Sequence, residues 1–173
     1  SALSCSYGIE MHKGVRIMAI SPGEFDILHQ TQAIRGQIMD SLSDADLAYK
    51  LPGDNPTLGA LCREIGQVEQ SYIDGFRTLK QSFAYPAVDP ALDTSVDKLK
   101  AWYATLDAEL EAALIALKDA DSQTTIIERG FPMPLGAQFH TYREALLIFY
   151  GKATCYLLAM GKPRSEQMKG WIG

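Results

Sequence analysis

Residue types that mark particular classes of protein are scarce in this chain of 173 residues. It has only three cysteines, Cys5, Cys62 and Cys155, which are far apart in the sequence. An odd number at such spacing predicts neither a disulfide framework nor a Cys-x-x-Cys metal site. Cys62 and Cys155 lie in apolar helical stretches, where a reduced cysteine is expected to behave as a small hydrophobe, which favours a cytoplasmic protein.

Long apolar runs and clustered positive charge are missing too. Charged residues lie in or beside the most apolar stretch, residues 145–160, so it predicts a buried helix rather than a membrane span. The 16 basic residues are scattered among 21 acidic ones, and nucleic acid binding requires clusters of Lys and Arg. Residues 1–20 have no signal-peptide core and are predicted to be an N-terminal extension. The sequence thus favours neither a nucleic acid nor a membrane as a partner.

The apolar residues that are present recur at helical spacing in four segments. The first segment opens with Ser21, Pro22 and Glu24, a pattern typical of a capped helix start. Asn55-Pro56 predicts a second start and Thr94 a third. The predicted helices cover about residues 21–41, 55–79, 94–117 and 135–160.

The segments between and after these helices add little regular structure. Residues 119–134 form a long connection whose β-prone middle, Thr124 to Ile127, is predicted to be extended. Trp171 and Ile172, in a short amphipathic tail, are expected to dock on the helices. We therefore predict an all-α fold, a four-helix bundle over residues 21–173.

Groups able to perform chemistry are few. The three histidines, His12, His29 and His140, lie in different segments, and no nucleophile elbow or phosphate-binding glycine loop is present. His140 and Glu144 are four residues apart, so their side chains lie on one face of the helix. They form either part of a metal site or a hydrogen-bonded pair. The aromatic residues of the last two helices either line a pocket or form core; these are Tyr103, Tyr142, Phe149, Tyr150 and Tyr156.

Two stretches resemble the DinB (DinB/YfiT-like) four-helix proteins. Residues 57–72, TLGALCREIGQVEQSY, resemble the family's second helix, in which a histidine is followed five residues later by a glutamate. Residues 149–152 and 160–163 are similar to the family's pattern on the fourth helix and the turn after it. The resemblance covers roughly residues 21–173 and implies a homodimer, which an excess of aliphatic residues also favours.

The resemblance also implies where a metal would bind. Family members that hold nickel or zinc use one histidine of the second helix and a His-x-x-x-His pair of the fourth. The matching positions here are Glu64, Ala145 and Phe149. Alanine and phenylalanine have no donor atoms, so no metal or other cofactor is expected at this site. Glu64 is expected to be neutral, paired with a base such as Arg143 or Lys152, or open to water.

Three interpretations of function follow. We predict a metal-free DinB-like protein that binds a small molecule or acts through self-association. The predicted pocket consists of Glu64, Tyr142, Ala145, Phe149 and Lys152. A metal-dependent transferase or hydrolase, like the family's thiol-S-transferases, would need nickel or zinc at a shifted site of Glu64, His140 and Glu144. In the third interpretation Phe149 fills the pocket, and the protein is a structural or interaction protein that works through its dimer surface.

Overall fold

A computed structural model of the chain describes residues 20–173. Most of the predicted extension, including Cys5 and His12, lies outside these residues, whereas Ile20 is buried in the core. The long helices are α1 (Pro22–Asp40), α2 (Leu58–Thr78), α3 (Val96–Ala116) and α4 (Leu135–Ala159). The short elements are η1 (Asp44–Ala48), η2 (Pro90–Asp93), β1 (Ile126–Glu128), β2 (Pro132–Pro134) and α5 (Glu166–Ile172).

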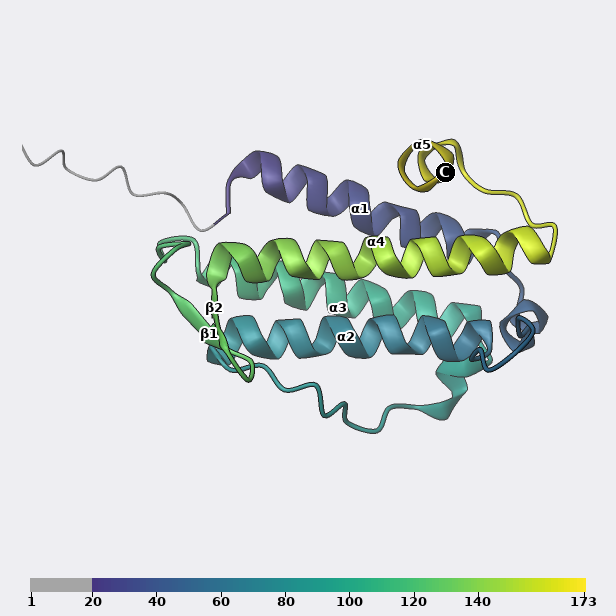
Figure 1. Cartoon of the computed structure of the whole chain (residues 1–173), viewed down its shortest axis with the longest axis horizontal. Helices are drawn as coiled ribbons and strands as arrows, with labels where there is room; N and C mark the ends of the chain where they lie inside the picture. Colours follow the sequence, from purple (N-terminus) through teal and green to yellow (C-terminus); the bar gives the residue numbers. More distant parts are fainter. Residues whose placement is uncertain (1–19) are drawn as a thin grey trace, which may run out of the picture.

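The four long helices form the predicted bundle. α1 packs against α3 and α4, and α2 packs against the same two helices, so α1 and α2 lie diagonally across the bundle. Residues 79–95 run back along the length of the bundle, and α2 and α3 therefore point in the same direction (Figure 1). Of the segment predicted to be extended, Thr124 to Ile127, only Ile126 and Ile127 lie in β1, and Thr124 lies in a turn. β1 pairs with β2 as an antiparallel hairpin at one end.

Two of the four helix starts differ from the prediction, and two agree with it, since α4 begins at Leu135 as predicted. Ser21 and Glu24 form the predicted capping box of α1. α2 begins at Leu58 and not at Asn55-Pro56: the Thr57 hydroxyl accepts the Ala60 N–H as the cap, whereas the Asn55 side-chain amide donates to the Pro52 carbonyl in the preceding turn. α3 is capped by Ser95, whose hydroxyl accepts the Lys98 N–H, rather than by Thr94. Several cap-forming residues adjoin each start, and the tertiary contacts select one.

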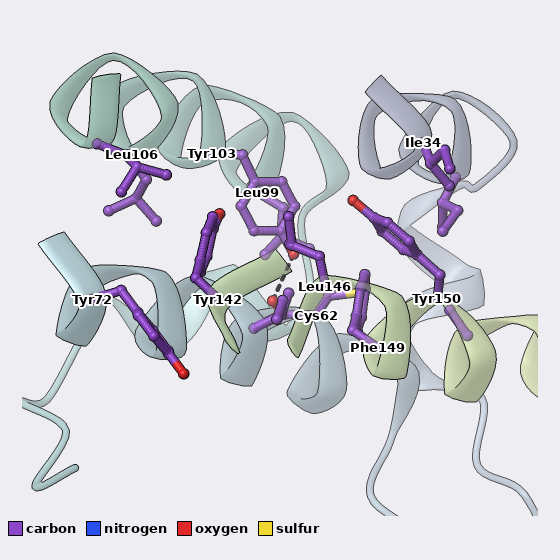
Figure 2. Packing of buried hydrophobic residues seen from close by; sticks show 14 of the residues in the cluster. Ile34, Cys62, Tyr72, Leu99, Tyr103, Leu106, Tyr142, Leu146, Phe149 and Tyr150 are labelled. Carbon is purple, nitrogen blue, oxygen red and sulfur yellow. Dashed lines mark hydrogen bonds between the residues drawn. The ribbon is translucent and has the colours of Figure 1, made fainter. Parts of the chain in front are cut away.

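The core contains the aromatic residues for which the sequence left two alternatives. Figure 2 shows Tyr103, Tyr142 and Tyr150 packed among the helices, and all three are buried. The Tyr103 hydroxyl donates to the Cys62 carbonyl at 2.6 Å. Burial raises the pKa of the Cys62 thiol to about 12, so Cys62 behaves as a small apolar residue.

The C-terminal tail docks through one of the two residues expected, Ile172, and through a further residue, Met168. Met168 of α5 is buried, and Ile172 is partly buried against the core. Trp171 is 44% exposed, so its predicted docking is wrong. A seven-residue helix presents one narrow face, and α5 uses Met168 for it. No helix within residues 20–173 has the length and apolar character needed to cross a membrane.

Candidate groove between α2 and α4

A small groove separates α2 from α4 on one face of the bundle. One hollow of about 150 Å³ lies between the two helices. Its lining residues come from successive turns of each helix and are Leu61, Glu64, Ile65, Val68, Ala145, Ile148, Phe149 and Lys152. Glu64, Ala145 and Phe149, chosen from the family pattern, thus meet in one place, together with Lys152.

A second hollow of about 280 Å³ continues the groove toward the start of α2. It shares Leu61, Glu64 and Lys152 with the first hollow. Its remaining lining residues are Leu51, Asn55, Pro56, Cys155 and Tyr156. Glu64 and Lys152 therefore lie midway along one continuous groove, where each can reach a molecule in either half.

The groove has an apolar floor and charged walls. Leu61, Ile65 and Phe149 are buried, whereas Glu64 and Lys152 are exposed on opposite helices. Among residues 20–173, neither charged side chain has a hydrogen bond or an ion pair. Glu64 is thus open to water, one of the three states expected for it. Partial burial and the nearby Glu64 carboxylate raise the pKa of Tyr85.

Other predicted site residues lie elsewhere. Tyr142 does not line the groove, because its ring is buried against Tyr72 with ring centroids 5.3 Å apart. His140 is exposed, and its Nε2 lies 3.4 Å from a Glu24 carboxylate oxygen of α1. Glu144 is exposed one turn farther along α4. The structure therefore does not assemble the shifted site of Glu64, His140 and Glu144.

The residues at the family's metal position do not fit a metal ion. Glu64 supplies one carboxylate, whereas Ala145 and Phe149 supply no donor atom. The Lys152 ammonium on the facing wall adds a positive charge that opposes a second cation. Within the described part of the chain, no three His, Cys, Asp or Glu side chains form a group able to hold a metal ion.

A buried charged cluster inside the bundle was not predicted. Arg35 of α1 is buried, and its two terminal nitrogens donate to Glu69 of α2 at 2.5 Å and to Asp107 of α3 at 2.6 Å. The guanidinium also lies 4.1 Å from the centroid of the Tyr103 ring. In the sequence, this cluster was indicated by a single arginine, Arg35, next to the apolar positions of the first helix. The sequence could not show which carboxylates it would meet.

Burial and the neighbouring charges shift the pKa values of Glu69 and Arg35 within this cluster. Burial raises the pKa of Glu69 to about 7, although the Arg35 guanidinium acts in the opposite direction. Burial also acts to lower the pKa of Arg35, but the Glu69 and Asp107 carboxylates outweigh it and keep that pKa well above its usual value. Glu69 Oε1 and the Tyr142 hydroxyl are buried and have no hydrogen-bond partner within residues 20–173. The cluster is therefore sensitive to the protonation of Glu69.

Comparison with known proteins adds a family to this geometry. A model of the DinB superfamily matches residues 27–149, which include the groove residues Glu64, Ala145 and Phe149. The chain belongs to the DinB superfamily. The DinB match spans most of the four-helix bundle and ends before Lys152 and α5. A comparison with curated protein sequences finds no significant match.

Proposed function

We propose that this DinB-superfamily protein binds a small organic molecule, without a metal, in the groove between α2 and α4. The proposal rests on two side chains of opposite charge, Glu64 and Lys152, which line the same groove above an apolar floor. Among residues 20–173, neither of them has an ion-pair partner. Exposed side chains of this kind are free to bond to a ligand. Each hollow is smaller than most ligand sites, which begin at roughly 300 Å³, so the proposed ligand is small and extends through both halves of the groove.

The walls of the groove favour a particular class of ligand. The Glu64 carboxylate accepts hydrogen bonds and attracts a positive group, whereas the Lys152 ammonium donates and attracts a negative one. Leu61 and Phe149 offer apolar surface for the rest of the molecule. A small zwitterion with an apolar body, such as an apolar amino acid, satisfies all three features. We further propose a cytoplasmic location, supported by the free thiols of Cys62 and Cys155.

Phenylalanine provides a direct probe of this ligand class. We expect it to raise the melting temperature and to shift NMR signals of groove residues more than phenethylamine or 3-phenylpropionate, each of which has only one of the two charges. Glu64→Gln and Lys152→Met should each weaken the response to phenylalanine. Glu128→Gln, an exposed carboxylate of β1 outside the groove, is the matched control.

A second variant separates binding in the groove from binding elsewhere. Ala145→Leu adds bulk to the groove and leaves both charged residues unchanged. We expect it to abolish the response to phenylalanine. An undiminished response in this variant, or an equal response of the native protein to the singly charged analogues, would show the proposal to be wrong.

A further inference from the structure

Arg129 lies beside two exposed aromatic rings at the end of the bundle that carries the β1–β2 hairpin (Figure 1). Its Cζ atom is 5.0 Å from the centroid of the Phe83 ring and 5.5 Å from the centroid of the Phe131 ring. Phe83 is 45% exposed and Phe131 is 53% exposed. A third ring, that of Tyr72, is buried, with its centroid 5.6 Å from the same Cζ atom. We call Arg129, Phe83 and Phe131 the hairpin site.

The Arg129 guanidinium carries a positive charge that no acidic side chain pairs with among residues 20–173. Only its Nη1 makes hydrogen bonds, to Gln138 Oε1 at 2.9 Å and to the Tyr72 hydroxyl at 3.4 Å. Nη2 makes none, and Nε is buried without a partner in the same part of the chain. A buried donor that lacks an acceptor is unfavourable, so an oxygen supplied from outside the chain would stabilise this arginine.

Buried polar side chains hold Arg129 in position. Gln138, which accepts from Arg129, donates through Nε2 to Gln81 Oε1 at 2.5 Å. Gln81 donates in turn to Ser71 Oγ at 3.0 Å, and all three of these polar residues are buried. The Gln81 backbone N–H also donates to the carbonyl of Glu128, the residue before Arg129, at 2.8 Å. The guanidinium is therefore fixed before any ligand arrives, which lowers the entropy lost on binding.

We propose that the hairpin site binds a small aromatic carboxylate. Nε–H and the adjacent Nη2–H form one edge of the planar guanidinium, and this edge matches the two oxygens of a carboxylate. Phe83 and Phe131 offer aromatic surface on which the ring of the ligand packs. Both rings are about half exposed, so they can turn to admit an oxygen to Nε. A single guanidinium neutralises one negative charge, which favours a monoanion over a dianion such as a phosphate monoester.

The hairpin site is distinct from the groove between α2 and α4. Its three residues line neither hollow of the groove. The groove presents a carboxylate and an ammonium, which suit a zwitterion, whereas the hairpin site presents the positive charge of Arg129 alone. The ammonium of a zwitterion bound there would lie close to the guanidinium and be repelled by it. The inference therefore does not rest on the ligand proposed for the groove.

Benzoate is the probe for this site. In an NMR titration of the native protein, benzoate should shift the Nε–H signal of Arg129 and the ring signals of Phe83 and Phe131. Benzyl alcohol has the ring without the charge, and acetate has the charge without the ring, so each should bind at least about tenfold more weakly. Ala145→Leu, which fills part of the groove, should bind benzoate as the native protein does.

Three variants test the assigned residues. Arg129→Gln should abolish benzoate binding, and Arg129→Lys should weaken it strongly, because lysine keeps the charge but has no planar fork. Phe131→Ala changes an exposed ring, so the fold is retained while benzoate binding should weaken by about threefold or more. Arg77→Gln is the matched control, since Arg77 is an exposed arginine of α2 paired with Glu109, and it should leave benzoate binding unchanged.

Several results would overturn the inference. Equal affinity of acetate and benzoate would remove the role of the rings, and undiminished benzoate binding in Phe131→Ala would do the same. Benzoate binding that leaves the Arg129 Nε–H signal unchanged, or that is lost in Ala145→Leu, would place the ligand elsewhere. Because the signal of Arg129 is read in the native protein, this result does not depend on whether the Arg129 variants fold.

Discussion

Phe149 illustrates how one residue can belong both to the core and to the candidate groove. Its ring is only 3% exposed, yet it forms part of the groove floor between α2 and α4. The family pattern predicted its position but not its burial. A ring this well enclosed is packed against neighbours on most sides, which places Phe149 among the residues that stabilise the bundle.

Phe149→Ala should lower the free energy of unfolding by about 3–5 kcal/mol, because it removes a buried ring and leaves a cavity. Ile115→Ala, at an exposed apolar position of α3, should change the free energy of unfolding by less than about 0.5 kcal/mol. Chemical denaturation measures both. A loss near 1 kcal/mol for Phe149→Ala would indicate that the ring only borders an open groove.

The ionisation of Glu69 should make the free energy of unfolding depend on pH between 4.5 and about 7. Its pKa is raised by burial from 4.5 to about 7, so the folded state holds this proton more tightly than the unfolded state. The resulting stabilisation is fully present below pH 4.5 and is lost as the pH rises through 7. We expect the free energy of unfolding to fall across this range.

Glu69→Gln has no carboxyl group at this position and should lose that component of the pH dependence. Asp46 provides an internal contrast, because its hydrogen bonds to Lys162 and Ser43 lower its pKa from 3.8 to about 2. Its contribution is therefore lost only at more acidic pH. A Glu69→Gln protein with an unchanged slope between pH 4.5 and 7 would assign the pH dependence to other groups.

The first turn of α2 depends on a close approach to η2. A Cβ added at Gly59 would lie 1.9 Å from the Asp93 carbonyl oxygen, which is backbone and cannot rotate away. The Arg63 side chain holds the same segment, since its Nε donates to the Asp93 carboxylate at 2.5 Å. The start of α2 is therefore positioned by the connection that precedes α3.

Gly59→Ala should destabilise the protein by about 1–3 kcal/mol through this steric clash. Gly36→Ala is the matched control in α1, where nothing lies within 4 Å of the added methyl group. It should stabilise the protein by up to about 1 kcal/mol, because alanine has the higher helix propensity. Thermal melts of the two variants should move in opposite directions, and equal shifts would contradict this account of the contact.

The bundle as a whole places its groove and its buried cluster in different environments. The groove opens between α2 and α4, where its charges meet water. The Arg35 cluster joins α1, α2 and α3 through the interior. Leaving one partner of such a buried pair without the other is strongly unfavourable, so the cluster constrains how these helices pack.

Metal content tests the groove in the intact molecule. We expect the purified protein to contain no stoichiometric nickel or zinc, since only Glu64 of the three family positions carries a donor atom. Glu64→His combined with Ala145→His and Phe149→His should create a site that binds either metal, detected by elemental analysis and a metal-dependent rise in melting temperature. The control is the double variant with Glu64→His and Phe149→His, which retains Ala145.

One tightly held metal per native chain would contradict this expectation. His140→Ala and Glu144→Ala would then test a site along α4. If the metal were lost from these two variants but retained in a single Ala145→His variant, its ligands would lie outside the family positions. If all of these variants retained the metal, its ligands would be residues other than those substituted.

Much of this architecture follows from local patterns. Apolar spacing predicted four helices, and the Ser21 capping box was predicted because cap and helix are neighbours in sequence. The family motif placed Glu64, Ala145 and Phe149 in one groove, because helices of known order bring fixed positions together. The tertiary structure decided the properties that depend on distant contacts. These were the partners of Arg35, the burial of Tyr142, the direction of α3, and the docking of Met168 rather than Trp171. A helical pattern specifies which side of a helix is apolar, whereas only packing specifies which residues of other helices face it.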